Sequence, residues 1–210
     1  MSQSALFFTF FDFFTLIVGV LIGITVHEAA HALTASLLGD PTAKWEGRIS
    51  LNPLRHLDPM GTLSLFIFHL GWGKPVPYNP NNFKYPTRDA ILTALAGPFA
   101  NLCTALLGIL LLKYIIPAET VLSQMISGIT IINLSLMVFN LLPIPPLDGS
   151  KLLLIIFRFE QFKNLTQLAY IPSVIFIVLI GIETILHIPI FTPYIGQAVS
   201  AILFFLYHIS

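Results

Sequence analysis

Residues 5–37 read ALFFTFFDFFTLIVGVLIGITVHEAAHALTASL, a single long apolar run that ends in two histidines and a glutamate. A helix crosses the hydrocarbon core of a bilayer with about 20 mostly apolar residues, because each residue adds about 1.5 Å. The run is long enough, so it predicts a transmembrane helix. His27, Glu28 and His31 then lie toward the inner end of that helix, where buried polar groups are costly unless they serve a purpose.

The composition of the whole chain agrees with a membrane location. Of the 210 residues, 56% are hydrophobic and only 10% are charged, whereas soluble domains carry about 25% charged residues. The formal net charge is zero and there is no basic block, which argues against a nucleic-acid partner. We therefore expect an integral membrane protein whose partners lie in or against the lipid bilayer.

Further apolar stretches approach the length of a membrane span. They are residues 89–112, 121–142, 168–188 and 190–209. Residues 143–160 are ambiguous, because a proline cluster breaks any helix that arrives from residue 142. We expect a helix that restarts after Gly149 and lies partly in the interface. The predicted fold is an all-α polytopic membrane protein with about five to six transmembrane helices, in one domain that covers residues 1–210.

The basic residues predict the orientation of these spans. Most Lys and Arg residues fall between the first two spans or after the third, whereas the loop near residues 113–119 has only Lys113. Because loops rich in Lys and Arg stay in the cytoplasm, we expect the N-terminus outside and the C-terminus inside. No Lys or Arg precedes Lys44, so the first apolar run is interpreted as a retained span and not as a signal peptide.

Residues 44–80, between the first two spans, do not look like one helix. They mix β-favouring residues with Gly and Pro at intervals that no helix tolerates. The run TLSLFIFHL is too short to cross as a helix, so we expect a small re-entrant β-hairpin or loop region here. Two prolines restrict KPVPYNP to an edge strand at most. An edge strand within residues 64–78 could pair with an unwound peptide, which makes Leu65 and Ile67 candidate substrate-binding residues.

The HEAAH segment has the spacing of a zinc site. Residues four apart share one face of a helix, so His27 and His31 can direct two imidazoles at one cation, with Glu28 about 100° away around the helix. Two nitrogen ligands suit zinc, and the carboxylate can take a proton from a zinc-activated water molecule. This is the HExxH pattern of metal-dependent hydrolases.

A catalytic zinc ion needs a third protein ligand and an open fourth position. Asp148 is the main candidate, because it follows a span that ends on the same side as HEAAH and a proline-broken turn can swing it inward. An N-cap for the helix that starts near Ser150 is the other interpretation of Asp148. His56 competes for the third place, although its polar, loop-like surroundings favour a turn or hydrogen-bond network.

Five motifs resemble, in this order, those of the site-2 proteases, the intramembrane zinc metalloproteases of peptidase family M50. They are HEAAH, GRISLNPLRHLDPMG, GWGKPVPYNP, AGPFAN and FNLLPIPPLDG. The resemblance covers about residues 20–155. It is closest to the compact subgroup, because neither a PDZ nor a CBS domain accompanies these motifs.

The resemblance implies a zinc metalloendopeptidase with one zinc ion per chain. The implied ligands are His27, His31 and Asp148. Glu28 would be the general base and acid, and the substrate would itself be a transmembrane helix, cut within or near the bilayer. Asn101, in the GPxxN motif, is a candidate for contacting the scissile region, although a helix-packing role is equally open. Asn140, before the LDG motif, is another candidate polar group at the site.

Two other functions stay open from the residues alone. A zinc-binding membrane transporter would use similar ligands, but an ion path needs polar groups at several depths, whereas the ligands here gather at one level. A catalytically inactive membrane scaffold is the second alternative, and the presence of Glu28 disfavours it. The compact form and the lack of a targeting sequence favour the cytoplasmic membrane of a prokaryote.

Overall fold

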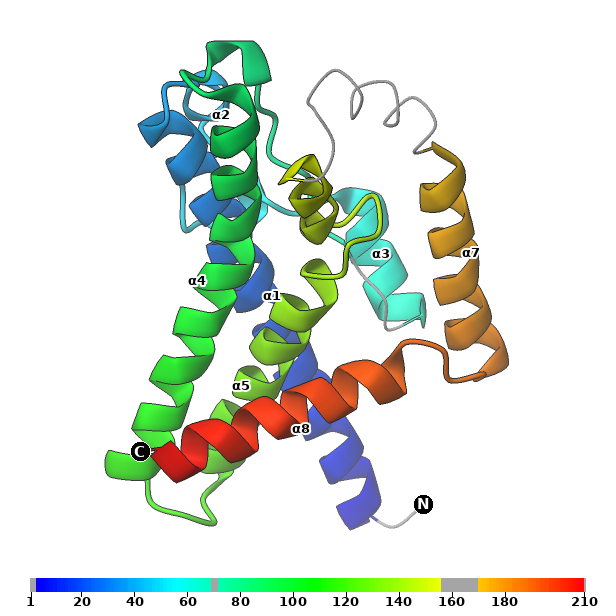
Figure 1. The fold of residues 1–210 in the computed structure, drawn as a ribbon. Helices are drawn as coiled ribbons and strands as arrows, with labels where there is room; N and C mark the ends of the chain where they lie inside the picture. The colour runs from blue at the N-terminus through cyan, green and yellow to red at the C-terminus, as the bar shows by residue number, and fades with distance from the viewer. Residues whose placement is uncertain (1–2, 69–71, 156–169, 210) are drawn as a thin grey trace.

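The computed structural model describes residues 3–68, 72–155 and 170–209 of the chain. Over these residues the fold is mostly helical and has no β-strand (Figure 1). The α-helices are α1 (Gln3–Leu37), α2 (Thr42–Trp45), α3 (Pro59–Phe68), α4 (Pro86–Tyr114), α5 (Val121–Asn140), α7 (Tyr170–Leu186) and α8 (Thr192–Ile209). Short 3-10 helices are η1 (Pro53–Arg55), η2 (Pro80–Asn82) and η3 (Asp148–Ile155).

Three of the described helices are long and apolar enough to cross a membrane. They are Phe10–Leu37 within α1, Pro86–Tyr114 and Val121–Asn140. These helices confirm the first three predicted spans. Helices α7 and α8 lie where the last two spans were expected, but the apolar helix Ile171–Leu186 is shorter than a span and α8 is not among the three. Of the five to six expected spans, the described residues therefore show three.

Local sequence signals fix the ends of the long helices. Pro86 opens α4 in its first turn, where a missing backbone N–H does no harm. At the start of α5, the Thr120 side chain accepts from the Ser123 backbone N–H and the Ser123 side chain accepts from that of Thr120, a capping box that pairs two otherwise unpaired donors. The prolines that follow Asn140 prevent α5 from continuing.

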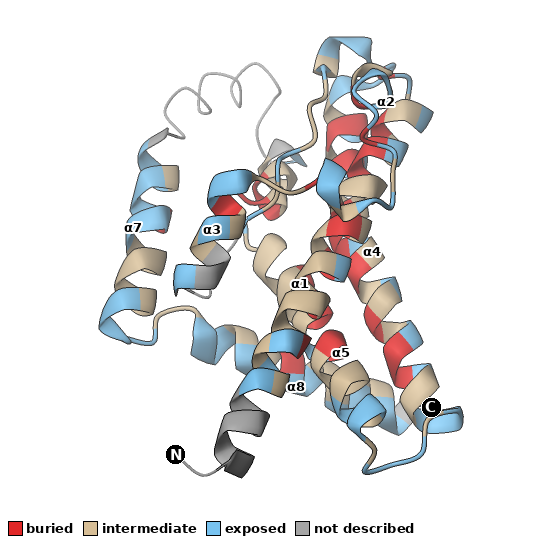
Figure 2. Cartoon of the chain, turned by 180° about the vertical axis from the view of Figure 1, so that it is seen from behind, coloured by how far each residue is buried: buried red, intermediate tan, exposed pale blue. Residues whose placement is uncertain are grey.

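Small residues let α1, α4 and α5 approach one another closely. A Cβ atom added to Gly128 of α5 would lie 2.6 Å from the Thr15 side chain of α1, and one added to Gly19 would lie 2.5 Å from Ile132 of α5. Close van der Waals packing of this kind holds membrane helices together. Figure 2 shows the buried residues along these three helices, whereas α7 is mostly exposed or half-buried.

Helix α8 packs against α5 and adds a core of its own. Ala105, Leu134, Met137 and Val199 form a buried apolar cluster between α4, α5 and α8. In Figure 1, α8 runs obliquely across α5, and the first turns of α1 lie toward the same end of the bundle as the last turns of α8. The expected orientation, with the N-terminus outside and the C-terminus inside, stays a prediction, because the structure includes no membrane.

The predicted re-entrant β-hairpin is wrong for the described part of residues 44–80. Residues 59–68 form helix α3, and residues 72–79 are extended with a single isolated bridge between Leu57 and Gly73. A helix satisfies its own backbone groups, whereas a lone apolar strand needs a partner strand, and the described residues contain none. Residues 69–71 lie outside the described residues, as do residues 156–169, which include part of the ambiguous stretch 143–160.

Candidate metal centre

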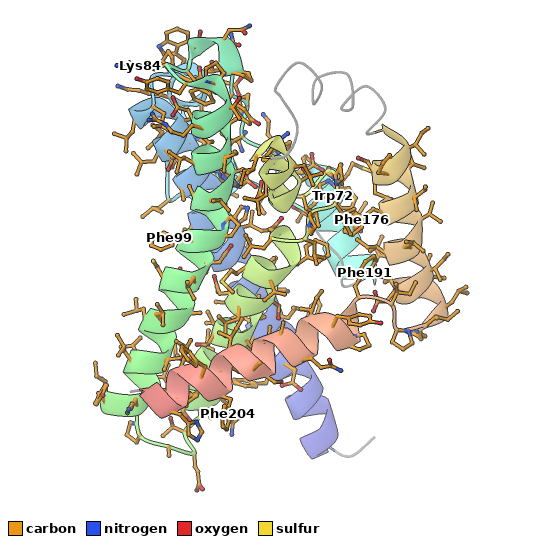
Figure 3. All side chains as sticks on the ribbon, viewed as in Figure 1. Trp72, Lys84, Phe99, Phe176, Phe191 and Phe204 are labelled. Carbon is orange, nitrogen blue, oxygen red and sulfur yellow. The ribbon has the colours of Figure 1, made fainter. Side chains whose placement is uncertain are left out.

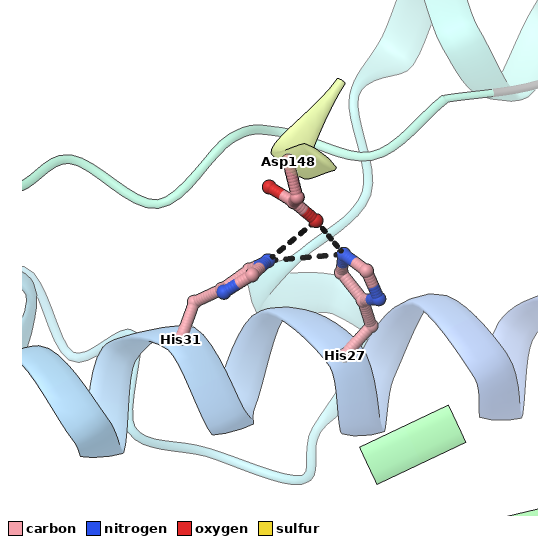
Figure 4. Close-up of side chains that lie close together, drawn as sticks. All are labelled: His27, His31 and Asp148. Carbon is pink, nitrogen blue, oxygen red and sulfur yellow. Dashed lines mark hydrogen bonds and ion pairs between the residues drawn. The ribbon is translucent and has the colours of Figure 1, made fainter. Parts of the chain in front are cut away.

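Three ligand atoms from two distant segments meet at one point (Figure 4). His27 Nε2 lies 3.0 Å from Asp148 Oδ2, His31 Nε2 lies 3.2 Å from the same oxygen, and the two Nε2 atoms are 3.0 Å apart. The histidines project from one face of α1, and Asp148 opens η3. Among the described residues these are the only His, Cys, Asp and Glu side chains that form such a group.

The turn before η3 brings Asp148 to the histidines. The chain leaves α5 at Asn140 and comes back close enough that a Cβ atom at Gly149 would collide with the carbonyl oxygens of Leu141 and Leu142. Only glycine allows this approach. The buried Ser150 hydroxyl donates to the Leu147 carbonyl at 2.6 Å, which steadies the start of η3. The Asp148 carboxylate contacts both histidines, so the geometry favours a metal ligand over an N-cap.

Hydrogen bonds behind the rings fix which nitrogen of each histidine faces the centre. His31 Nδ1 donates to the Thr93 carbonyl oxygen at 2.7 Å, and His27 Nδ1 donates to Asn101 Oδ1 at 2.6 Å. A neutral imidazole has one N–H, so both Nε2 atoms present lone pairs. Outer partners of this kind are usual for histidines that bind metals.

The residues present fit a zinc ion. Two nitrogen lone pairs and a carboxylate oxygen face one another at 3.0–3.2 Å, and three such acceptors repel one another unless a cation lies between them. Zinc binds such ligand atoms at about 2.0–2.1 Å in a tetrahedral arrangement, which puts any two ligand atoms about 3.3 Å apart. The separations between the two nitrogens and the oxygen are close to this distance. The floor of this centre is Gly97 of α4, where a Cβ atom would lie 2.5 Å from His31 Nε2 and 2.6 Å from His27 Nε2.

The centre opens into a cavity of about 780 Å³. The cavity is lined by residues of α1, α5, α7, η3 and the extended segment 72–78, and its wall includes Glu28. Figure 3 shows Trp72, Phe176 and Phe191 close together beside α3 and α7. Phe176 contacts Phe139 and Phe191, with ring centroids 5.7 and 5.3 Å away, so aromatic contacts join α7 to the cavity.

The extended segment 72–78 forms the wall opposite the histidines. A Cβ atom at Gly73 would lie 3.7 Å from Glu28 Oε1 and 2.8 Å from Ile24. The buried Arg48 holds this segment from behind, because its guanidinium donates to the carbonyl oxygens of Lys74 and Pro75, the latter at 3.2 Å. Val76 makes no backbone hydrogen bond to another described residue, so its N–H and C=O are free to pair with a peptide.

Tyr78 lies at the end of this segment and is one of the residues that line the cavity. Burial, and then the nearby charge of Asp148, raises the pKa of the Tyr78 hydroxyl above its ordinary value. The phenol therefore stays neutral at pH 7 and keeps its O–H as a possible hydrogen-bond donor.

The other sequence-predicted site residues fall in different places. Asn140 lines the cavity and donates from its amide to the Leu136 carbonyl at 3.0 Å. Asn101 is fully buried behind His27 and is not among the cavity residues. Ile67 lies exposed on α3 outside the cavity lining, and the side chain of Leu65 lies outside the described part of the chain. His56 is buried apart from the centre, with Nε2 donating to the Ser50 carbonyl at 2.7 Å.

Three residues that shape the site were not predicted from the sequence. Thr93 contributes through its backbone carbonyl, which no side-chain pattern reports. Arg48 was counted only as a loop charge, although its burial beside the extended segment gives it another role. Asn133 hydrogen bonds to Asn101 at 3.0 Å, and a lone asparagine within an apolar span was the signal that could have revealed it.

The fold and the centre describe a helical membrane protein with a candidate His-His-Asp metal site beside a carboxylate, and the comparisons name the family. Residues 115–182 match the model of peptidase family M50. The chain is 40% identical over 146 residues to "Putative zinc metalloprotease YwhC" of Bacillus subtilis (strain 168), covering 66% of this chain and 67% of that protein. It therefore belongs to peptidase family M50, the site-2 protease family.

More distant relatives agree with this assignment. The chain is 35% identical over 143 residues to "Putative zinc metalloprotease Rip2" of Mycolicibacterium smegmatis and 34% identical over 142 residues to the Rip2 protein of Mycobacterium tuberculosis. Each match covers 65% of this chain and 55% of the relative. No solved structure gives a significant match.

Proposed function

We propose that this protein is a zinc metalloendopeptidase that hydrolyses peptide bonds of transmembrane-helix substrates. One observation carries the proposal: His27, His31 and Asp148 converge beside Glu28 at the wall of a large cavity within a bundle of membrane helices. Family membership and the names of the bacterial relatives support the same function. The relatives also support a prokaryotic cytoplasmic membrane, where the Lys and Arg positions put the metal centre near the cytoplasmic side.

The roles of the residues follow from their places. His27, His31 and Asp148 would hold one zinc ion, which when bound supplies a Lewis acid that polarises the scissile carbonyl and makes water more acidic. Glu28, on the next position of the same helix, takes the proton of the attacking water and returns it to the leaving amine. Asn140 and Tyr78 are polar groups of the cavity wall that can contact the peptide.

The extended segment 72–78 is the proposed binding edge for substrate. A transmembrane helix hides its carbonyl groups in hydrogen bonds, so the segment to be cut must unwind first. The free backbone groups of Val76 can replace lost bonds, since an extended peptide binds well along an unpaired edge. We favour this edge over Ile67, which is not among the described residues that line the cavity, whereas the expected role of Leu65 stays a prediction.

A cleavage assay tests the function. The purified chain in detergent is mixed with a single-span model substrate, with and without a zinc chelator, beside Glu28→Gln. We expect chelation to abolish cleavage, and Glu28→Gln to lower turnover by roughly 10²–10⁴-fold while it still binds zinc, because a general base is lost and no ligand is removed. Cleavage that survives both treatments contradicts the proposal. Zinc flux in liposomes without cleavage would indicate a transporter, and zinc binding with neither would indicate a scaffold.

A further inference from the structure

Asn133 is a fully buried amide in the apolar middle of α5, and it belongs to none of the family motifs. An unpaired amide at this depth would be costly, so each polar atom of the Asn133 side chain needs a hydrogen-bond partner. Its Nδ2 donates to the Ile129 carbonyl one turn earlier at 2.9 Å. A carbonyl oxygen can only accept, so this bond fixes the amide nitrogen there and turns Oδ1 toward α4.

The orientation of Asn133 determines that of Asn101. Asn101 Nδ2 donates to Asn133 Oδ1 and to the Gly23 carbonyl of α1, both at 3.0 Å. An amide nitrogen has two hydrogens, and both are used by these bonds. Asn101 Oδ1 is therefore the atom left to face His27, and the reversed amide would set an oxygen against two acceptors.

The chain of bonds ends at the metal centre. Asn101 Oδ1 lies 2.6 Å from His27 Nδ1 and can only accept, so Nδ1 carries the hydrogen and the Nε2 lone pair faces His31 and Asp148. We propose that Asn133 is a positioning residue of the metal centre, which holds His27 in its metal-binding tautomer and orientation through Asn101. This rests on the proposed zinc site but not on any peptidase activity.

A purely structural role would predict something different. Asn133 would then only join α4 to α5, and its loss would weaken the helix bundle without acting on His27 in particular. Thr130 offers the matched comparison. It is buried on the same helix, three residues earlier, and its hydroxyl donates only to the Ile126 carbonyl of its own helix at 2.8 Å.

The first test leaves Asn133 and Asn101 unaltered. Nitrogen NMR of the ¹⁵N-histidine-labelled, zinc-free full chain in detergent shows which ring nitrogen carries the hydrogen. We expect His27 as the Nδ1–H tautomer, with its resonances assigned by their loss in His27→Gln. A His27 ring protonated at Nε2 alone overturns the proposal, regardless of the zinc affinities of the Asn133 variants.

The second test measures zinc affinity by competition with a chelator. Asn133→Leu removes the oxygen and keeps the branched shape of the side chain, so we expect about a tenfold loss of affinity, the lower end of the range for outer partners of metal ligands. Asn133→Asp should keep most of the zinc affinity of the unaltered chain, because its protonated carboxyl group can still donate to the Ile129 carbonyl and accept from Asn101. Thr130→Val should bind zinc as the unaltered chain does.

A double-mutant cycle shows whether Asn133 acts through Asn101. In the Asn101→Leu background, Asn133→Leu should cause no further loss of zinc affinity, because the connection is already cut. An equal loss in both backgrounds, or unchanged affinity of Asn133→Leu, overturns the proposal. If Asn133→Leu does not fold, the Asn133→Asp variant and the NMR result decide. An unaltered chain that binds no zinc contradicts the proposed function itself.

Discussion

Asp148 Oδ2 lies 3.0 Å from His27 Nε2, although 121 residues separate them in the chain. One residue comes from the first membrane helix and the other from a turn after the third. The metal centre therefore exists only when α1 and η3 are in place, which couples metal binding to the folded state.

Zinc should stabilise the fold through this connection. A ligand that binds only the folded state raises its stability by mass action, by about 2.7 kcal/mol at a hundredfold excess over the dissociation constant. We expect zinc to raise the melting temperature of the unaltered chain and to have little effect on Asp148→Ala. Glu46→Ala, at an exposed carboxylate, is the control and should respond as the unaltered chain does. An equal response of Asp148→Ala would show that zinc binds elsewhere.

Gly97 should tolerate no side chain, since a Cβ atom there would lie 2.5–2.6 Å from both Nε2 atoms. Gly97→Ala must push at least one ring away from the centre. We expect zinc affinity to fall by roughly 10–100-fold, as when an outer partner of a ligand is lost. Gly196→Ala makes the same change on α8 in open space and should have no effect. Equal zinc affinity of Gly97→Ala and Gly196→Ala would contradict the geometry proposed for the centre.

Arg48 should affect substrate binding more than zinc binding. Its guanidinium holds the carbonyl groups of Lys74 and Pro75 behind the proposed binding edge. Hydrogen bonds of charged groups contribute about 1.5–3 kcal/mol, so Arg48→Ala should raise KM for a single-span substrate by at least about tenfold, with zinc affinity unchanged. Lys44→Ala, at an exposed cation of the neighbouring helix α2, is the control. A fall in kcat with unchanged KM would argue against this binding edge.

Asp40 should make the stability of the fold depend on pH. Burial opposes its ionisation, but hydrogen bonds from Thr42, Asn82 and Asn79 outweigh burial and hold the pKa of Asp40 below its ordinary value. Because the folded pKa is lower than the unfolded one, the carboxylate stabilises the fold at neutral pH, and this contribution is lost as pH falls from about 4 through the folded pKa.

Melting curves in detergent from pH 7 to pH 3 check this expectation. The unaltered chain should melt above Asp40→Asn by a constant margin down to about pH 5, and the margin should shrink below about pH 4. Glu46→Gln provides the comparison for an exposed carboxylate. A margin that stays constant through the acid range would mean that Asp40 acts by shape and not by charge.

The sequence by itself determined the three long membrane helices and named the candidate ligands. Apolar length predicted α1, α4 and α5, because a membrane span must bury about 20 residues and satisfy its own backbone. The four-residue spacing of His27 and His31 placed both rings on one face of α1, since helical geometry is local. Asp148 could be proposed as their partner, because few other ionisable residues lie near the spans.

Only the tertiary structure decided how the centre is held and what surrounds it. Helix α3 replaced the expected strand, because the described part of the chain contains no second strand that could share its hydrogen bonds. Asn101 proved to lie behind His27 and not in the cavity, and Asn133 lies behind Asn101. These contacts join helices that are 32 to 74 residues apart in the chain. Sequence spacing fixes neighbours along one helix, whereas packing between helices depends on side chains from all of them at once.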